Sequence, residues 1–312
     1  MQWHARCMKY DKKNDCRGVI VHKPVVTVGV PAYNAEKYLV PALESLLNQT
    51  LTDFELVISD NASTDGTAAI CQEFANADPR VSYIRQPKNL GGPRNWNFLA
   101  AHASAPYFKW AAANDVCAPT LIERGVAALE ANPGAVLAHG DSALIDSEGE
   151  EIERYADPLD AGAGDAAYRF QRVLETLGLN NAQNGVIRRT GLARTHLEGI
   201  YSAGDVTFVA ELALFGRFVK IPELLFYRRV AADASTLGMS AADIGEFNNP
   251  GARRRRSQDT LAQSIDLVRR VWTSPLGYRD RLRLSTYLLR RLYWERNALW
   301  AELWPWQTGR QP

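Results

Sequence analysis

The sequence lacks several features that define common classes of protein. It has no stretch of 18 consecutive apolar residues, so we expect no membrane-spanning helix. The motif GxxxxGK[ST] is absent, which excludes a P-loop nucleotide hydrolase. Ser63 does not lie in a Gly-x-Ser-x-Gly segment, which argues against a serine hydrolase. These three classes are therefore set aside.

Cysteine is scarce, with four residues at Cys7, Cys16, Cys71 and Cys117. No two of them form a CxxC pair, and a zinc site that combined the first two with His4 and His22 would follow no established spacing. Residues 1–23 also lack the apolar stretch of a signal peptide, and we interpret them as a weakly ordered extension. We therefore expect a cytoplasmic protein with reduced thiols.

Lysine is absent from residues 251–312, yet this segment is strongly basic. It holds 13 Arg and 5 acidic residues, a net charge of +8, whereas the whole chain has a formal net charge of +1. Its tryptophans are Trp272, Trp294, Trp300, Trp304 and Trp306. Basic helices with tryptophan can lie on an anionic membrane, here the inner face of the plasma membrane, or pack on the rest of the protein with solvated Arg faces. Both interpretations stay open, and we expect no nucleic-acid partner.

From Pro24 onward, short β-branched segments alternate with segments of helical spacing. The expected strands of the first half are Val25–Val30, Phe54–Ser59, Val81–Arg85 and Tyr107–Ala112. Helices are expected between them and at Leu121–Ala131, with a kink or restart at Pro41. This alternation predicts an α/β fold with a mostly parallel, Rossmann-related sheet flanked by helices. Ligands of such sheets bind beyond the carboxyl ends of the strands, where Asp60 and Asn114-Asp115 lie.

The second half is less regular in pattern. Strands are expected at Ala135–Asp146 and Gly185–Arg188, and helices at Ala167–Leu177 and Asp205–Phe215. A pair of strands is expected around Pro222, and residues from Arg253 onward have helical spacing. The sequence therefore predicts one α/β domain followed by a helical tail.

Several segments carry a resemblance to a known family. PAYN stands before the first helix, DNASTDGT follows the second strand, and NLGGPRNWN, YFKWAAANDVCAPTLIE and YSAGDVTFVAELALFGRFVKIPELLFYRRV come later. In this order and spacing, the chain resembles family 2 glycosyltransferases of the GT-A fold over roughly residues 24–230. The resemblance implies a GT-A-like domain at 24–240 and leaves residues 241–312 as a basic, Trp-rich helical tail.

The resemblance implies a divalent cation, Mg²⁺ or Mn²⁺, on the donor diphosphate. The family places a DxD-like signature at the end of the fourth strand, and the matching residues here are Ala113, Asn114 and Asp115. Asp115 is the implied metal ligand, because hard cations prefer carboxylate oxygens. Asn114 departs from the pattern, since an amide contributes no charge. The alternative interpretation is that Asp115 is a solvated residue in a turn at the end of the strand.

The resemblance also implies a nucleotide pocket. Asp60 and Asn61 match positions that usually face the base, and a carboxylate there can accept the imide N–H of uracil or thymine. Asp60 can instead organise its loop as an Asx turn. Pro31, Ala32 and Tyr33 match the pocket lining, although an aromatic role in the core remains an alternative for Tyr33.

Two further segments are implied to approach the donor. Asn89 and Arg94 belong to the glycine-containing turn, where Arg can neutralise phosphate, although a plain connection from loop to helix explains the glycines equally well. Arg228 and Arg229 could contact the diphosphate. Relatives often have His at the next position, where this chain has Val230.

An inverting transfer needs a base that removes the proton of the acceptor hydroxyl. The family places a carboxylate at the start of a late helix, and Asp205 matches that position. An ordinary helix cap is the competing interpretation, because Asp is a common cap residue.

We therefore expect an inverting glycosyltransferase with a UDP or dTDP sugar donor and a role in surface glycan or glycoconjugate synthesis. The expected acceptor is a glycan, a lipid-linked sugar or a small molecule, by family analogy alone. Two alternatives remain. A catalytically degenerate protein that binds a nucleotide-sugar or glycan would fit Asn61, Asn114 and Val230, and a sugar nucleotidyltransferase would share the architecture.

Overall fold

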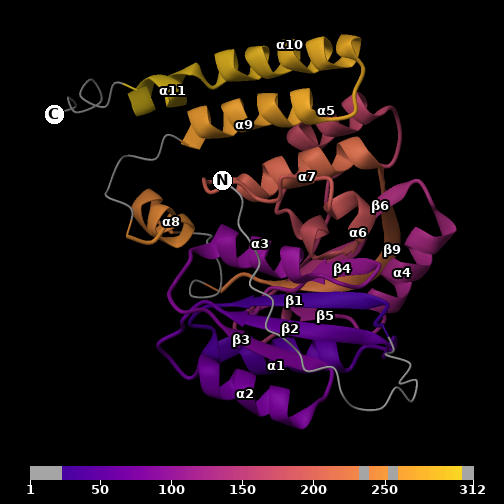
Figure 1. Cartoon of the computed structure of the whole chain (residues 1–312), viewed down its shortest axis with the longest axis vertical. Coiled ribbons are helices and arrows are strands. Elements are labelled where there is room, and N and C mark those ends of the chain that lie inside the picture. Colours follow the sequence, from indigo (N-terminus) through magenta and orange to yellow (C-terminus); the bar gives the residue numbers. More distant parts are fainter. Residues whose placement is uncertain (1–22, 232–238, 252–258, 304–312) are drawn as a thin grey trace, which may run out of the picture.

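The computed structural model describes residues 23–231, 239–251 and 259–303 (Figure 1). The expected N-terminal extension, with its two cysteines, lies outside the described residues except for Lys23. Trp304, Trp306 and the arginines at 253–256 also lie outside them.

A single mixed sheet forms the centre of the molecule, with strand order β3-β2-β1-β4-β8-β6-β9-β5 and β7 paired to β6. Its first half is parallel, as the sequence pattern predicts, and its strands are β1 (Val26–Ala32), β2 (Phe54–Asp60), β3 (Val81–Arg85) and β4 (Tyr107–Trp110). These strands are short, rich in β-branched residues and largely buried, as strands covered on both faces are. The expected α/β class is confirmed.

The second half of the sheet contains the antiparallel pairs. Its strands are β5 (Val116–Cys117), β6 (Ala135–Ile145), β7 (Glu151–Tyr155), β8 (Val186–Arg188) and β9 (Arg217–Arg229). The two strands expected around Pro222 form one strand, because β9 stays paired with β6 on both sides of it. The partner of Gly140 is Ile221 and that of Asp141 is Leu224, so a bulge absorbs Pro222, which has no N–H to donate.

Helices cover both faces of the sheet and enclose two apolar cores (Figure 1). The helices of the first core are α1 (Glu36–Leu47), α2 (Thr67–Ala77) and α4 (Leu121–Ala131). Those that pack into the second core include α3 (Gly92–His102), α5 (Ala166–Thr176), α6 (Arg189–Leu192) and α7 (Gly204–Phe215). α1 continues through Pro41, so the expected restart does not occur.

The C-terminal helices pack back on the α/β part. They are α8 (Ala241–Asn248), α9 (Asp259–Thr273), α10 (Tyr278–Trp294) and α11 (Arg296–Leu303). Leu267 and Val271 of α9 belong to the second core, which also contains residues of α3, α5 and α7. One apolar core therefore runs across residue 240, where the sequence places the start of the tail.

A buried ion pair fixes α9 to α7. The guanidinium of Arg270 donates to Glu211, and both side chains are almost fully buried. Arg270 also donates through Nε to Asp266 at 2.8 Å, and Tyr201 donates to the same carboxylate at 2.6 Å. Because Tyr201 precedes α7, the tail reaches the loop that leads into this helix.

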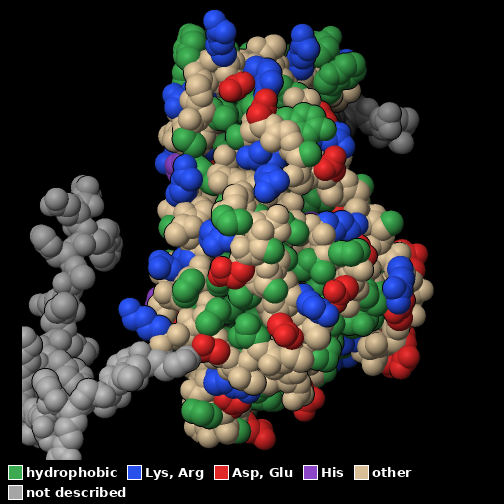
Figure 2. All heavy atoms as spheres, turned by 90° about the vertical axis from the view of Figure 1, so that its right-hand side faces the viewer, with side chains coloured by type: hydrophobic (Ala, Val, Ile, Leu, Met, Phe, Trp, Pro, Cys, Tyr) green, Lys and Arg blue, Asp and Glu red, His purple; other side chains and the backbone are tan. Residues whose placement is uncertain are grey.

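The outer face of α10 keeps large aromatic residues in solvent. Tyr293 is 63% exposed and Trp294 is 77% exposed. Basic and hydrophobic side chains lie side by side at the top of the molecule, where α10 lies (Figure 2). No helix of the described residues has the length and hydropathy required to cross a bilayer. Contact of this face with a membrane surface stays a prediction.

Replacing Arg270 by Ala is expected to destabilise the fold by about 3–5 kcal/mol, because Glu211 would stay buried without its guanidinium partner and keep only its contacts with His196. Denaturant unfolding followed by circular dichroism measures this loss. Arg269→Ala is the matched control, since Arg269 is the exposed neighbour on the same helix. Equal stability of the two variants would contradict the importance of the buried pair.

Candidate functional site

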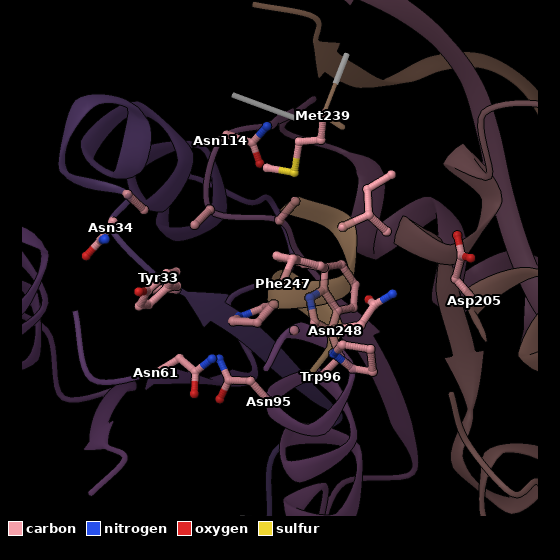
Figure 3. A pocket seen from close by; sticks show the side chains of 18 of the residues that line it. Tyr33, Asn34, Asn61, Asn95, Trp96, Asn114, Asp205, Met239, Phe247 and Asn248 are labelled. Carbon is pink, nitrogen blue, oxygen red and sulfur yellow. The ribbon is translucent and has the colours of Figure 1, made fainter. Parts of the chain in front are cut away.

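A cavity of about 930 Å³ opens beyond the carboxyl ends of β1, β2 and β4. Its walls come from the segment after β1, the loop between β4 and β5, the short helix η1 (Asn181–Asn184), the start of α7 and helix α8. Amide side chains make up much of the lining, and these residues are Asn34, Asn61, Asn89, Asn95, Asn114, Asn180, Gln183, Asn184 and Asn248 (Figure 3). The cavity is where an open α/β sheet is expected to bind its ligand.

Asp115 lines the cavity at the end of the turn that follows β4. Its Oδ1 accepts a hydrogen bond of 2.9 Å from the backbone N–H of Arg229 on β9. Its Oδ2 has no hydrogen-bond partner among the described residues. Burial raises the pKa of Asp115 to about 6, while the Arg229 N–H and the charges of Arg228 and Lys109 oppose this rise. One oxygen of the carboxylate is therefore available to a ligand.

The surroundings of Asp115 fit a cation only in part. Within the described ranges, no group of three or more His, Cys, Asp or Glu side chains could hold a metal ion. A single carboxylate oxygen suits a cation such as Mg²⁺, which keeps several waters and binds through one or two carboxylates plus the phosphates of the substrate. Asn114 and Met239 also line the cavity (Figure 3).

The two arginines at the end of β9 have different surroundings. Arg228 lines the cavity and donates to Asn181 Oδ1 at 3.1 Å and to the carbonyl of Leu179. Arg229 is buried away from the cavity lining, and its guanidinium donates to the carbonyls of Asn114, Asp146 and Ser147. It also lies over the Tyr38 ring, 4.6 Å from the centroid. Arg229 therefore fixes the loop of Asp115, and only Arg228 borders the ligand space.

Asp60 and Asn61 lie at the end of β2, but only Asn61 borders the cavity. The carboxylate of Asp60 is fully buried and accepts hydrogen bonds from Ser63 N at 2.8 Å, Tyr83 Oη at 2.9 Å and Arg85 at 2.6 Å. The bond to Ser63 N, three residues on, closes the loop, whereas the expected Asx turn would use the N–H two residues on. The structure therefore places Asp60 in the loop scaffold and its neighbour Asn61 at the ligand space.

The end of β1 and the residue after it form another wall of the cavity. Pro31, Ala32 and Tyr33 all line it. Tyr33 is 43% exposed and lies at the side of the cavity opposite Asp205 (Figure 3). An aromatic role in the core therefore does not apply to Tyr33.

Of Asn89 and Arg94, only Asn89 borders the cavity. Asn89 lines the cavity and accepts from Asn61 Nδ2 and from Gly91 N, both at 2.8 Å. Arg94 does not line the cavity and donates to Asn249 Oδ1 at 2.9 Å. Gly91 has φ +88, and a Cβ there would meet the backbone oxygen of Asn248. The glycine turn therefore lets α8 lie closely against the start of α3.

Asp205 lies in the first turn of α7 and borders the cavity. The N-cap position of this helix belongs to Ala203, so Asp205 is not the cap residue. Its Oδ2 accepts a hydrogen bond of 2.9 Å from Asn180 Nδ2, and its Oδ1 has no partner among the described residues. Asp115 and Asp205 thus line the same cavity, and each has one oxygen that makes no hydrogen bond with the described residues.

Sequence reasoning missed the carboxyl group of Glu198 and the helix that covers part of the cavity. Glu198 is buried, borders the cavity and follows no motif of the family. Burial and the charge of Asp205 raise its pKa to about 8. Helix α8 brings Phe247 and Asn248 to the lining. The only sequence signal for this region is the amide-rich run at 180–184, which has no strand or helix pattern.

The family model for glycosyl transferase family 2 matches residues 27–183 of this chain. The chain belongs to this family. An Escherichia coli chondroitin synthase is 28% identical over 242 residues, which are 77% of this chain and 34% of that protein. The chain therefore spans about a third of the length of this curated relative.

Solved structures with low sequence identity share the fold. S. aureus TarS 1–349 in complex with UDP-GlcNAc has a TM-score of 0.63 at 18% identity, covering 86% of this chain and 72% of that one. A mannosyltransferase from Pyrobaculum calidifontis in complex with GDP-Man and Mn²⁺ has a TM-score of 0.50 at 16% identity, with coverages of 94% and 77%. The expected GT-A fold is confirmed.

Replacing Asp60 by Asn is expected to destabilise the folded chain by about 1–3 kcal/mol, because its three donors would lose a buried, charged acceptor. Nucleotide affinity of the folded protein should stay unchanged, since Asp60 does not border the cavity. Thermal unfolding and isothermal titration with UDP measure the two effects. Tyr83→Phe, which removes one of the three donors, is the control. A large loss of UDP affinity in a fully folded Asp60→Asn variant would show that this carboxylate contacts the nucleotide.

Proposed function

We propose that this protein is an inverting glycosyltransferase that moves a sugar from a nucleoside diphosphate, UDP or dTDP, to an acceptor hydroxyl. The observation that carries the proposal is the pair Asp115 and Asp205, which border one cavity, each with an unengaged oxygen. A cavity of about 930 Å³ is large enough for a nucleotide sugar. Membership of the family supports glycosyl transfer as the reaction class.

The nucleoside end of the donor is assigned to the wall formed by Tyr33 and Asn61. Tyr33 offers an exposed ring for contact with a base, and Asn61 is held in place by Leu90 N at 2.7 Å and Asn89 Oδ1 at 2.8 Å. An amide both donates and accepts, so it can match the imide edge of uracil or thymine. The UDP-GlcNAc complex of TarS, which has the same fold, supports a uridine donor.

The diphosphate is assigned to the side of Asp115 and Arg228. A divalent cation, Mg²⁺ or Mn²⁺, would bind Asp115 Oδ2 together with diphosphate oxygens, and when bound it supplies positive charge to the leaving nucleoside diphosphate. The Mn²⁺ complex of the Pyrobaculum calidifontis mannosyltransferase supports this choice of cofactor. Arg228 adds a fixed positive charge at the same wall, because its guanidinium is held by Asn181 and Leu179.

Asp205 is assigned as the base of a single displacement. The acceptor oxygen attacks the anomeric carbon, and its proton passes to the unengaged Oδ1 of Asp205. The bond between the anomeric carbon and the diphosphate oxygen breaks with its electron pair on the leaving group. Attack from the face opposite the leaving group inverts the anomeric centre. Asn180 holds Oδ2 of Asp205 by a hydrogen bond during the transfer, so Oδ2 positions the carboxylate while Oδ1 takes up the proton.

The acceptor is assigned to a class only. The likeness to a chondroitin synthase supports a sugar hydroxyl of a growing polysaccharide, such as a cell-envelope glycan, over a small molecule.

A catalytically degenerate donor-binding protein is the second candidate, and Asn114 in place of an acidic residue favours it. Donor hydrolysis or transfer excludes this candidate, because a pure binder turns over neither.

Asp205→Asn is expected to lower transfer by a factor of about 10²–10⁴, because the amide cannot take up the acceptor proton. Donor affinity should stay within about twofold of the unmodified protein, since Asp205 lies away from the nucleotide wall. Release of UDP from UDP-GlcNAc, with Mn²⁺ and an oligosaccharide acceptor panel, measures turnover, and calorimetry with UDP measures binding. Asp160→Asn, at an exposed site, is the control. A fully active Asp205→Asn variant would remove this residue as the base.

Asp115→Ala is expected to abolish the gain in UDP affinity that Mn²⁺ provides, because the described residues of this wall then offer the cation no carboxylate. Titration of UDP with and without Mn²⁺ measures the difference. Affinity without Mn²⁺ should change little. The same Mn²⁺ dependence in the variant and in the unmodified protein would discard Asp115 as the ligand.

A further inference from the structure

Two amide side chains connect Asp205 to the buried Glu198. Asn180 Nδ2 donates to Asp205 Oδ2 at 2.9 Å and to Gln183 Oε1 at 2.7 Å. Gln183 Nε2 in turn donates to Glu198 Oε1. The four side chains all border the cavity and are largely shielded from solvent. A continuous chain of hydrogen bonds therefore runs from one carboxyl group to the other.

This chain of hydrogen bonds has a direction. An amide presents nitrogen on one side and oxygen on the other, so carboxyl oxygens that accept at the two ends, Asp205 Oδ2 and Glu198 Oε1, together favour one orientation of both amides. Because Glu198 Oε1 accepts from Gln183, the oxygen of Gln183 faces Asn180, and the nitrogen of Asn180 faces Asp205. The reversed orientation would place an amide oxygen against Asp205 Oδ2.

The neighbours of Asn180 determine the orientation of its side-chain amide, although this orientation leaves the amide oxygen without a hydrogen bond. Its Oδ1 is buried and has no hydrogen-bond partner. Its backbone is left-handed, with φ 55, which is uncommon for a residue other than glycine. Leaving a buried acceptor unpaired costs free energy, so the bonds to Asp205 and Gln183 must offset it.

We propose that Glu198 is a positioning residue of the transfer reaction, which acts through Gln183 and Asn180 to hold Asp205 Oδ2 and leave Oδ1 for the acceptor hydroxyl. The proposal rests on the assignment of Asp205 as the base. Glu198 itself touches neither the donor nor the reacting atoms in this scheme. It determines where the base points.

The charges near Glu198 agree with this arrangement. Its pKa is raised to about 8, first by burial and then by the charge of Asp205, while the bond from Gln183 and the charge of Arg270 lower it. The positive charge of Arg270 is already shared by Glu211 and Asp266. At neutral pH Glu198 therefore keeps its proton, and its carbonyl oxygen remains an acceptor for Gln183.

Kinetics of two variants test the positioning role. Glu198→Leu keeps the volume but removes the acceptor, and it should lower kcat about tenfold or more, a part of the about 10²–10⁴-fold that a general base contributes. The KM for UDP-GlcNAc should not change. Glu198→Gln keeps an acceptor oxygen and should restore kcat to within about threefold. Unchanged kcat in Glu198→Leu, or no recovery in Glu198→Gln, would overturn the proposal.

Melting temperatures test the coupling without any turnover. Between about pH 4.5 and about pH 8 the folded state holds a proton on Glu198 that the unfolded state releases, so stability falls as pH rises. The Glu198→Gln variant does not titrate at this position, so its stability does not fall in this way as pH rises. Its melting temperature should therefore exceed that of the unmodified protein by an amount that grows from pH 5 to pH 8. In an Asp205→Asn background this gain should shrink, because a charge that raises the pKa of Glu198 is gone.

The two experiments separate this proposal from the proposed function. An equal gain in both backgrounds would show that the two carboxyl groups are not coupled, and it would overturn the role of Glu198. Loss of turnover in Asp205→Asn with full turnover in Glu198→Leu would also overturn it, while the base assignment would stand. Full turnover in Asp205→Asn would instead contradict the proposed function, whatever the melting temperatures show.

Discussion

The hydrogen bond from the backbone N–H of Arg229 to Asp115 Oδ1 is the contact on which the site depends. It joins two residues that are 114 positions apart, because β9 pairs with β6 on one side and with β5 on the other. Through it, the loop after β4 and the strand that carries Arg228 form one wall. The Arg229 side chain strengthens this wall by binding three loop carbonyls.

The carboxyl groups of Asp60, Asp115 and Asp205 differ in how many hydrogen bonds they accept from the described residues. Asp60 is buried, and three donors bind its carboxylate, so it stabilises its loop and offers little to a ligand. Asp115 and Asp205 each accept one hydrogen bond and keep one oxygen unengaged. Burying a partly engaged carboxylate costs free energy, and a protein tolerates this cost where the group has a task.

Much of the fold and part of the site could be predicted from the sequence. Local pattern located the strands of the first half and the bounds of α4, and the meeting of strand ends placed Asp115 at the cavity. Pattern could not decide between Asp60 and Asn61, because neighbouring residues at a strand end point in different directions. Glu198 was missed because it lies in an irregular loop, where only long-range packing fixes position. The sequence pattern predicts two strands in place of the continuous β9, because a proline in the sequence does not reveal that a bulge will accommodate it.

The amide lining of the cavity has a consequence for how it recognises sugars. Amides carry no net charge and do not titrate, and each one both donates and accepts, as carbohydrate hydroxyls do. Their contacts are barely screened by salt, in contrast to those of an arginine-lined phosphate pocket. Under the proposed function, recognition of hydroxyls by these amides should therefore be insensitive to ionic strength, and any dependence on salt should come from the charged residues of the lining, such as Arg228.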